Sequence, residues 1–116
     1  ILNDLNAHDG VPLQFFGQPA LTSLVTAELA LKFDAPLVPV WGIRQPDGLS
    51  FEVIVEAPIE PSDAITMTQE FNDRLEAQVR SHPEQWFWIH RRWKDGTGHM
   101  AERGARRAAQ IADKSA

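Results

Sequence analysis

The sequence predicts an α/β fold in which a small sheet is flanked by helices. Apolar residues at helical spacing precede two short apolar runs of strand length, and a second set at helical spacing follows. The chain has 116 residues, 43% of them hydrophobic, and no cysteine, so it can bury one small core without disulfides. Two strands are too few for an independent sheet. We therefore expect half of an α/β layer structure, with the missing strands upstream in a larger protein.

The first third of the chain is predicted to be a strand end and a loop, followed by a helix. Residues 13–16 form a short apolar stretch within the loop of residues 1–19. Gly10 and Gly17 flank this stretch and can adopt the positive φ that tight turns require. Residues 20–33 place Leu and Val residues at helical spacing and predict the first helix.

The middle of the chain predicts a β-hairpin. Residues 37–43 are continuously apolar, as in a strand buried on both faces, although Pro39 favours an edge or a bulge. Residues 44–48 contain a Pro-Asp-Gly turn. Residues 50–57 alternate between apolar and polar side chains, which is typical of a half-buried strand.

Two helical segments are predicted in the second half. The first begins at Ser62 or Asp63 and runs to about Arg80, because apolar residues recur every four positions. The second covers residues 83–94. An Asp-Gly-Thr-Gly break follows it, and we divide the chain there into a main unit, residues 1–94, and a basic Ala- and Arg-rich tail, residues 95–116.

Charge is unevenly distributed along the chain. Residues 1–89 hold thirteen acidic residues against four Lys or Arg, whereas residues 90–116 hold seven Lys or Arg against three acidic residues. Such a basic end either meets an anionic partner or is simply solvated. The overall pI near 5.2 and the lack of a recognised motif argue against nucleic-acid binding.

The segment from Trp86 to Lys94 combines tryptophans with cations. On a helix, Arg91 and Lys94 would share one face, and Trp88 and Arg92 could form a cation–π pair. Such a segment can contact an anionic headgroup while its rings meet apolar surface. The alternative is a helix that docks on the core and leaves its basic residues in solvent.

Several ordered motifs resemble one known family. Residues 83–94 read Pro-Glu-Gln-Trp-x-Trp-x-His-Arg-Arg-Trp-Lys, which is similar to the C-terminal signature of the bacterial lipid A biosynthesis acyltransferases. Residues 3–10 and the Phe-Phe-Gly-x-Pro-Ala block at residues 15–20 resemble two further family blocks, and residues 35–40 resemble a family strand. Leu5 and His8 depart from the family pattern, in which Gln and Asn occupy these positions.

The resemblance implies a fold and an activity. The fold is the C-terminal half of a glycerolipid-acyltransferase-like α/β sandwich, with an incomplete sheet. The activity is transfer of a fatty acyl chain from acyl carrier protein or acyl-CoA to a lipid A precursor or related glycolipid, at the cytoplasmic face of the bacterial inner membrane. No cofactor is implied. The related phosphatidylinositol mannoside acyltransferases share the fold and the Phe-Phe-Gly block.

The family's catalytic unit is expected outside this chain. In the family a His-x-x-x-x-Asp or Glu motif, with His as general base, lies upstream of the Phe-Phe-Gly block. His90 and Asp95 have this spacing, but they lie in or next to the C-terminal block, so we do not interpret them as the catalytic pair. No other His in the chain has the spacing.

The expected site residues are therefore supporting ones. For substrate binding, through the phosphates of a lipid A precursor or of phosphopantetheine, we expect Arg91, Arg92, Lys94, His90 and Trp88. For support we expect Asp4, Asp9, Phe16 and Gly17, with Phe15 and Phe16 either lining an acyl groove or packing in the core. The four histidines have no paired ligand spacing, so no metal site is expected. A non-catalytic module that binds anionic lipid or a carrier protein is the alternative.

Overall fold

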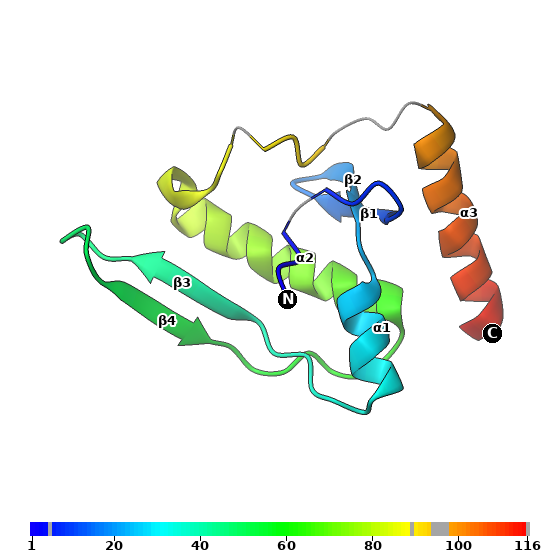
Figure 1. Cartoon of the computed structure of the whole chain (residues 1–116), viewed down its shortest axis with the longest axis horizontal. Coiled ribbons are helices and arrows are strands. Elements are labelled where there is room, and N and C mark those ends of the chain that lie inside the picture. Colours follow the sequence, from blue (N-terminus) through cyan, green and yellow to red (C-terminus); the bar gives the residue numbers. More distant parts are fainter. Residues whose placement is uncertain (5, 89, 94–97, 116) are drawn as a thin grey trace.

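The fold consists of two antiparallel hairpins packed with three helices, as the computed structural model in Figure 1 shows. The structure describes residues 1–4, 6–88, 90–93 and 98–115. This arrangement confirms the predicted incomplete α/β sandwich. The elements are β1 (Val11–Phe15), β2 (Gln18–Thr22), α1 (Val25–Lys32), β3 (Val40–Arg44), β4 (Phe51–Val55), α2 (Ala64–Ser81), the 3₁₀ turn η1 (Pro83–Gln85) and α3 (Gly98–Ser115).

The first hairpin replaces the predicted strand end and loop with two paired strands, and it corrects the predicted start of the first helix. β1 and β2 pair from Val11–Thr22 to Phe15–Gln18, so the chain through Thr22 is extended and α1 begins only at Val25. The hairpin turns through Phe16 and Gly17, whose φ angles are +52° and +73°. Two residues with positive φ are the requirement of a type I′ turn, which matches the twist of the paired strands.

The second hairpin is confirmed, but its burial differs from the prediction. β3 and β4 pair from Val40–Val55 to Arg44–Phe51. Only Trp41 of β3 is buried, so the expectation of a strand covered on both faces is wrong for the described residues. The opposite face is apolar and open to solvent, and its exposed members are Val40 (53% exposed), Phe51 (58%), Val53 (66%) and Val55 (65%).

α2 joins the two hairpins because the apolar cluster near its end contains residues of both. Near its start, Ala64 and Met67 pack in a cluster that includes Val11, Leu24 and Ile59. Near its end, Leu75 and Val79 pack in a second cluster with Phe15 of the first hairpin and Trp41 of the second. The position of the first hairpin, including its turn at Phe16 and Gly17, therefore depends on α2.

The predicted helix over residues 83–94 is wrong in its described part. Helical geometry ends at Gln85, and Trp86 already has extended dihedral angles of φ −82° and ψ 136°. The indole of Trp88 donates to the carbonyl of Pro83 at 2.6 Å. This bond pairs a ring N–H with a backbone carbonyl, so the carbonyl has a partner that a helical ladder does not supply, which favours an irregular path.

The basic tail forms α3, which lies against the first hairpin (Figure 1). Ala108 and Ile111 pack on the first cluster. Arg107 donates to the carbonyl of Asp9 at 2.9 Å and lies 3.4 Å from the Glu28 carboxylate. Part of the basic end is therefore engaged by the acidic body. In the described ranges no helix has the length and apolarity needed to cross a membrane.

The start of α2 is sensitive to its cap. Asp63 accepts from the backbone amide of Thr66 at 2.9 Å and from its hydroxyl at 2.7 Å, which confirms one of the two predicted caps. Asp63→Ala is expected to lower the free energy of unfolding by about 1 kcal/mol, measured by urea denaturation. Asp63→Asn retains an acceptor and should lose clearly less; equal losses would show that the cap is unimportant.

Candidate functional site

The candidate site is built around the turn at Phe16 and Gly17. A bulky residue at positive φ is a conformational outlier, and such outliers concentrate at functional positions. Phe16 holds this conformation at φ +52°, and Gly17 beside it has no atom within 4 Å of the position of a Cβ. The turn is thus strained and accessible at once, so other contacts must hold it in place.

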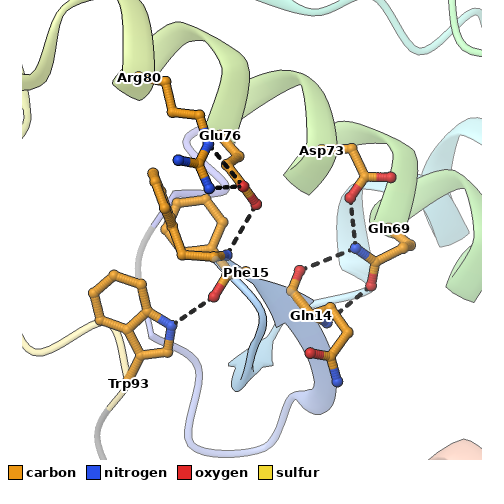
Figure 2. A network of polar contacts seen from close by, with 8 residues as sticks. Gln14, Phe15, Gln69, Asp73, Glu76, Arg80 and Trp93 are labelled. Carbon is orange, nitrogen blue, oxygen red and sulfur yellow. Dashed lines mark hydrogen bonds and ion pairs between the residues drawn. The ribbon is translucent and has the colours of Figure 1, made fainter.

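The first support comes from α2, as Figure 2 shows. The backbone amide of Phe16 donates to Glu76 Oε2 at 2.9 Å. Arg80 donates to Glu76 Oε1 through Nη2 at 2.6 Å, and its guanidinium lies 4.6 Å from the centre of the Phe16 ring. The hydrogen bond from Arg80 is the largest effect on Glu76 and, together with the weaker one from the Phe16 amide, holds the pKa of this carboxyl below its ordinary value although burial acts to raise it.

A second contact from α2 fixes the adjacent residue of β1. The side-chain amide of Gln69 accepts from the backbone amide of Gln14 and donates to its carbonyl, both at 2.9 Å (Figure 2). Gln69 Nε2 also donates to Asp73 at 2.9 Å. The amide of Gln69 therefore pairs with β1 as the backbone of a neighbouring strand would.

The third support comes from the C-terminal signature segment. Trp93 donates through its indole N–H to the carbonyl of Phe15 at 2.9 Å (Figure 2), and the two rings stack at 5.4 Å between centres. Phe15 itself is fully buried. Of the two open alternatives for this residue, the structure therefore favours core packing over an exposed acyl groove.

Arg92 lies inside the protein. Its side chain is fully buried, and it donates to the Leu21 carbonyl at 2.9 Å and to the Thr22 hydroxyl at 2.8 Å. Its cation lies 5.3 Å from the Phe15 ring centre, so the predicted stacking partner, Trp88, is wrong. Burial lowers the pKa of Arg92 to about 10, while the charge of Asp4 acts in the opposite direction. Arg92 is thus placed to hold β2.

The N-terminal segment meets the same region. The Asn6 amide donates to His90 Nε2 at 3.0 Å, and the Asn6 side chain donates to the Arg92 carbonyl at 3.3 Å. Because a backbone amide can only donate, His90 Nε2 is unprotonated here and its lone pair is occupied. Two of the motifs that suggested a family, at either end of the chain, are therefore in direct contact.

Gly10 allows the N-terminal segment to approach this region. A Cβ on Gly10 would lie 2.5 Å from the Thr22 carbonyl oxygen, so a side chain there would collide with the backbone. Its φ is not in the positive range, unlike that of Gly17. The predicted positive φ is therefore confirmed for Gly17. At Gly10 the glycine is required instead because the backbone of Thr22 approaches so closely.

The other predicted residues are dispersed. Arg91 and Trp88 are exposed, and Asp9 lies beside α3, where its carboxylate is 3.8 Å from Arg107. Lys94 and Asp95 lie outside the described residues. The ligand-binding roles of these residues, and of His90 and Arg92, stay predictions.

The residues that hold the turn were missed by the sequence analysis. Glu76 and Arg80 are four positions apart on α2, a spacing that predicts an ion pair, but nothing in the sequence indicates that Phe16 is their third member. Asn6 was noted only as part of the block at residues 3–10, and nothing in the sequence pointed to Gln69.

Comparison with known proteins identifies several relatives. Residues 3–95 match the family described as bacterial lipid A biosynthesis acyltransferase. The phosphatidylinositol mannoside acyltransferase of Mycobacterium tuberculosis (strain ATCC 25618 / H37Rv) is 28% identical over 102 residues, covering 88% of this chain and 30% of the relative. The lipid A biosynthesis lauroyltransferase of Escherichia coli (strain K12) is 38% identical over 87 residues, covering 72% of this chain and 28% of the relative. The chain thus spans less than a third of the length of these relatives.

The buried guanidinium of Arg92 can be tested against its exposed neighbour. Arg92→Ala removes a buried side chain and leaves the Leu21 carbonyl and Thr22 hydroxyl without their donor, so we expect a loss of about 3 kcal/mol in the free energy of unfolding. Arg91→Ala, the matched control at an exposed site, should change it by less than about 0.5 kcal/mol. Equal effects in denaturant titrations would contradict the structural role of Arg92.

The Glu76 contact predicts a pH dependence. Because the pKa of Glu76 is lowered in the folded state, its stabilisation is complete above its unfolded value, near about 4.3, and disappears as pH falls through the lower folded value. Glu76→Gln should cost about 0.5–1 kcal/mol at pH 7, and the difference from wild type should shrink below pH of about 4. Thermal unfolding between pH 7 and 3 measures this. Glu84→Gln, at an exposed carboxylate, should show no such convergence.

Proposed function

Because the chain belongs to the bacterial lipid A biosynthesis acyltransferase family, we propose that the protein transfers a fatty acyl chain from acyl carrier protein or acyl-CoA to a hydroxyl of a lipid A precursor or related glycolipid. The relatives include one enzyme named for lipid A biosynthesis and others named for phosphatidylinositol mannoside. What they share is a glycolipid acceptor, so the proposal is made at that level.

One observation supports this proposal most directly. The N-terminal block, the Phe-Phe-Gly block and the C-terminal block, which are distant in sequence, form one contact network through Asn6, His90, Arg92 and Trp93. Blocks that carry a family resemblance are expected to converge when they serve one site. The network therefore supports a common role for them in the acyltransferase.

The general base is proposed to lie in another part of the protein. A hydroxyl acceptor needs a positioned base to become a competent nucleophile. His90 does not fill this role, since its Nε2 already accepts the amide hydrogen of Asn6. We assign His90 and Arg92 to positioning the segment, and we place the His-x-x-x-x-Asp or Glu unit N-terminal to Ile1.

Substrate contact is proposed for the exposed part of the C-terminal segment. The rings of Phe87 and Trp88 are 65% and 54% exposed, and Arg91 beside them is exposed too. Apolar rings next to a cation suit the interface between a membrane and water, where anionic headgroups lie. We therefore propose that Arg91, Lys94 and Trp88 meet the phosphorylated glycolipid at the cytoplasmic face of the inner membrane.

The alternative function rests on the same exposed segment. A module that only binds anionic lipid or an acidic carrier protein would also need Trp88 and Arg91 at the surface. It would bind vesicles in a salt-dependent manner, without acyl transfer. Activity of the whole polypeptide separates the two functions.

The test is acyl transfer by the whole polypeptide that contains this chain, with acyl carrier protein or acyl-CoA as donor and a phosphorylated glycolipid as acceptor. Arg91→Ala is expected to raise KM for the acceptor about tenfold, equivalent to about 1.4 kcal/mol, with little change in kcat or thermal stability. Arg91→Lys should recover part of the loss, because it restores the charge.

The outcome that contradicts the proposal is also defined. If the whole polypeptide transfers no acyl group, but binds anionic vesicles and loses that binding on Arg91→Ala, the binding module is correct. If Arg91→Ala changes neither KM nor vesicle binding while transfer proceeds, the enzyme assignment survives and the role of Arg91 is wrong.

A further inference from the structure

The C-terminal helix α3 lies outside the region that the family match covers. That match ends at residue 95, and α3 begins at Gly98. The helix nevertheless packs on the matched region, because Ala108 and Ile111 contact the first apolar cluster. Figure 1 shows it beside the first hairpin. Family membership therefore gives α3 no role, although the helix touches elements that belong to the family match.

Arg107 joins α3 to two other parts of the chain. Its Nη1 donates to the Asp9 carbonyl at 2.9 Å, and its Nη2 lies 3.4 Å from both carboxylate oxygens of Glu28 on α1. The Asp9 carboxylate lies 3.8 Å from Nη1 and adds a longer-range attraction. A guanidinium presents its donors in a planar fork, so it can bridge two acceptors that the single nitrogen of a lysine cannot match. Arg107 therefore holds the loop at Asp9 against both α3 and α1.

The loop that carries Asp9 is a compact turn of the N-terminal block. The Gly10 amide donates to the Ala7 carbonyl at 3.0 Å, which is the hydrogen bond of a four-residue β-turn. Asn6 lies directly before this turn. Because the turn is closed by its own hydrogen bond, a displacement of Asp9 also displaces Asn6.

Asn6 in turn contacts the residues on either side of Arg91. Its backbone amide donates to His90 Nε2 at 3.0 Å, and its side chain donates to the Arg92 carbonyl at 3.3 Å. Arg91 is exposed between these two contacts. The path of the backbone at Arg91 therefore depends on where Asn6 lies.

We propose that Arg107 is a positioning residue for the acceptor, acting through the turn at Asp9 and through Asn6 on Arg91. The inference rests on the proposed function, in which Arg91 meets the phosphorylated glycolipid. Arg107 itself touches no substrate in this arrangement. The simpler alternative is that α3 only adds stability by covering the first apolar cluster, in which case loss of Arg107 lowers Tm and leaves acceptor binding unchanged.

Hydrogen exchange tests the first half of this route. It is measured by mass spectrometry on the whole polypeptide that contains this chain. In Arg107→Ala, peptides that cover residues 3–10 should exchange about tenfold faster than in wild type, because the turn opens more often. Peptides from β4 should be unchanged and serve as the internal reference. Arg106→Ala, at an exposed position on the same helix, is the matched control and should alter neither. Unchanged exchange at residues 3–10 in Arg107→Ala would overturn the proposal.

A double-mutant cycle on acyl transfer tests the second half. Arg107→Ala should raise KM for the phosphorylated glycolipid about three- to fivefold, with little change in kcat. In the Arg91→Ala background the same substitution should change KM by less than about 1.5-fold, because the side chain that Arg107 positions is absent. Effects that simply multiply would overturn the route through Arg91.

Two further variants separate positioning from stability. Arg107→Lys keeps the charge but cannot bridge both acceptors, so it should recover only part of the loss in KM. Arg74→Ala removes another bridging arginine, which donates from α2 to the Ala57 carbonyl at 2.6 Å and lies 3.5 Å from Glu56. It should lower Tm without raising KM for the acceptor. An equal rise in KM for Arg74→Ala and Arg107→Ala would show a general effect of stability and overturn the proposal.

Failure of the proposed function gives a different result from failure of this inference. If the whole polypeptide transfers no acyl group, the same cycle is measured on its affinity for vesicles that contain anionic phospholipid. Coupling between Arg107 and Arg91 in vesicle binding would support the positioning role without acyl transfer. Independent effects, or no effect of either residue, would overturn it.

Discussion

A single buried guanidinium connects the two ends of the chain. Arg92 donates to β2 at Leu21 and Thr22, its backbone carbonyl accepts from Asn6, and its cation faces the ring of Phe15. A buried cation is costly unless it is hydrogen-bonded, and here Nη1 and Nη2 meet a backbone carbonyl and a hydroxyl, whereas Nε has no hydrogen-bond partner among the described residues. The C-terminal signature segment therefore carries a residue that the rest of the fold is arranged around.

α2 completes this arrangement by supplying side chains to backbone groups. Glu76 accepts the Phe16 amide and Gln69 pairs with Gln14, so strained and unpaired backbone of the first hairpin is satisfied by one helix. The apolar side of the same helix packs in both clusters. Polar and apolar contacts of α2 thus set the first hairpin relative to the second, and with it the Phe16–Gly17 turn.

Local chemistry was predictable from sequence, whereas long-range contact was not. The Asp63 cap, the turn between β3 and β4 and the extent of α2 follow from nearby residues, and the predicted family membership was confirmed. The first hairpin was missed because Phe16 is an unusual residue at positive φ, and the helix over residues 83–94 failed because its indoles bond backbone groups. Arginine is usually found at the surface, so the sequence does not indicate that Arg92 is buried. Only the packing of the two chain ends shows it.

The side-chain amides of two glutamines hydrogen-bond to strand backbone as a neighbouring strand would. Gln69 and Gln85 each offer one donor and one acceptor to a single backbone residue, Gln14 and Arg44 respectively. A side-chain amide can match one residue of an edge but cannot extend along it. Gln85 therefore closes the edge of β3 at Arg44 without extending the sheet: the backbone groups of that residue are already hydrogen-bonded, and a strand could pair there only by displacing the Gln85 amide.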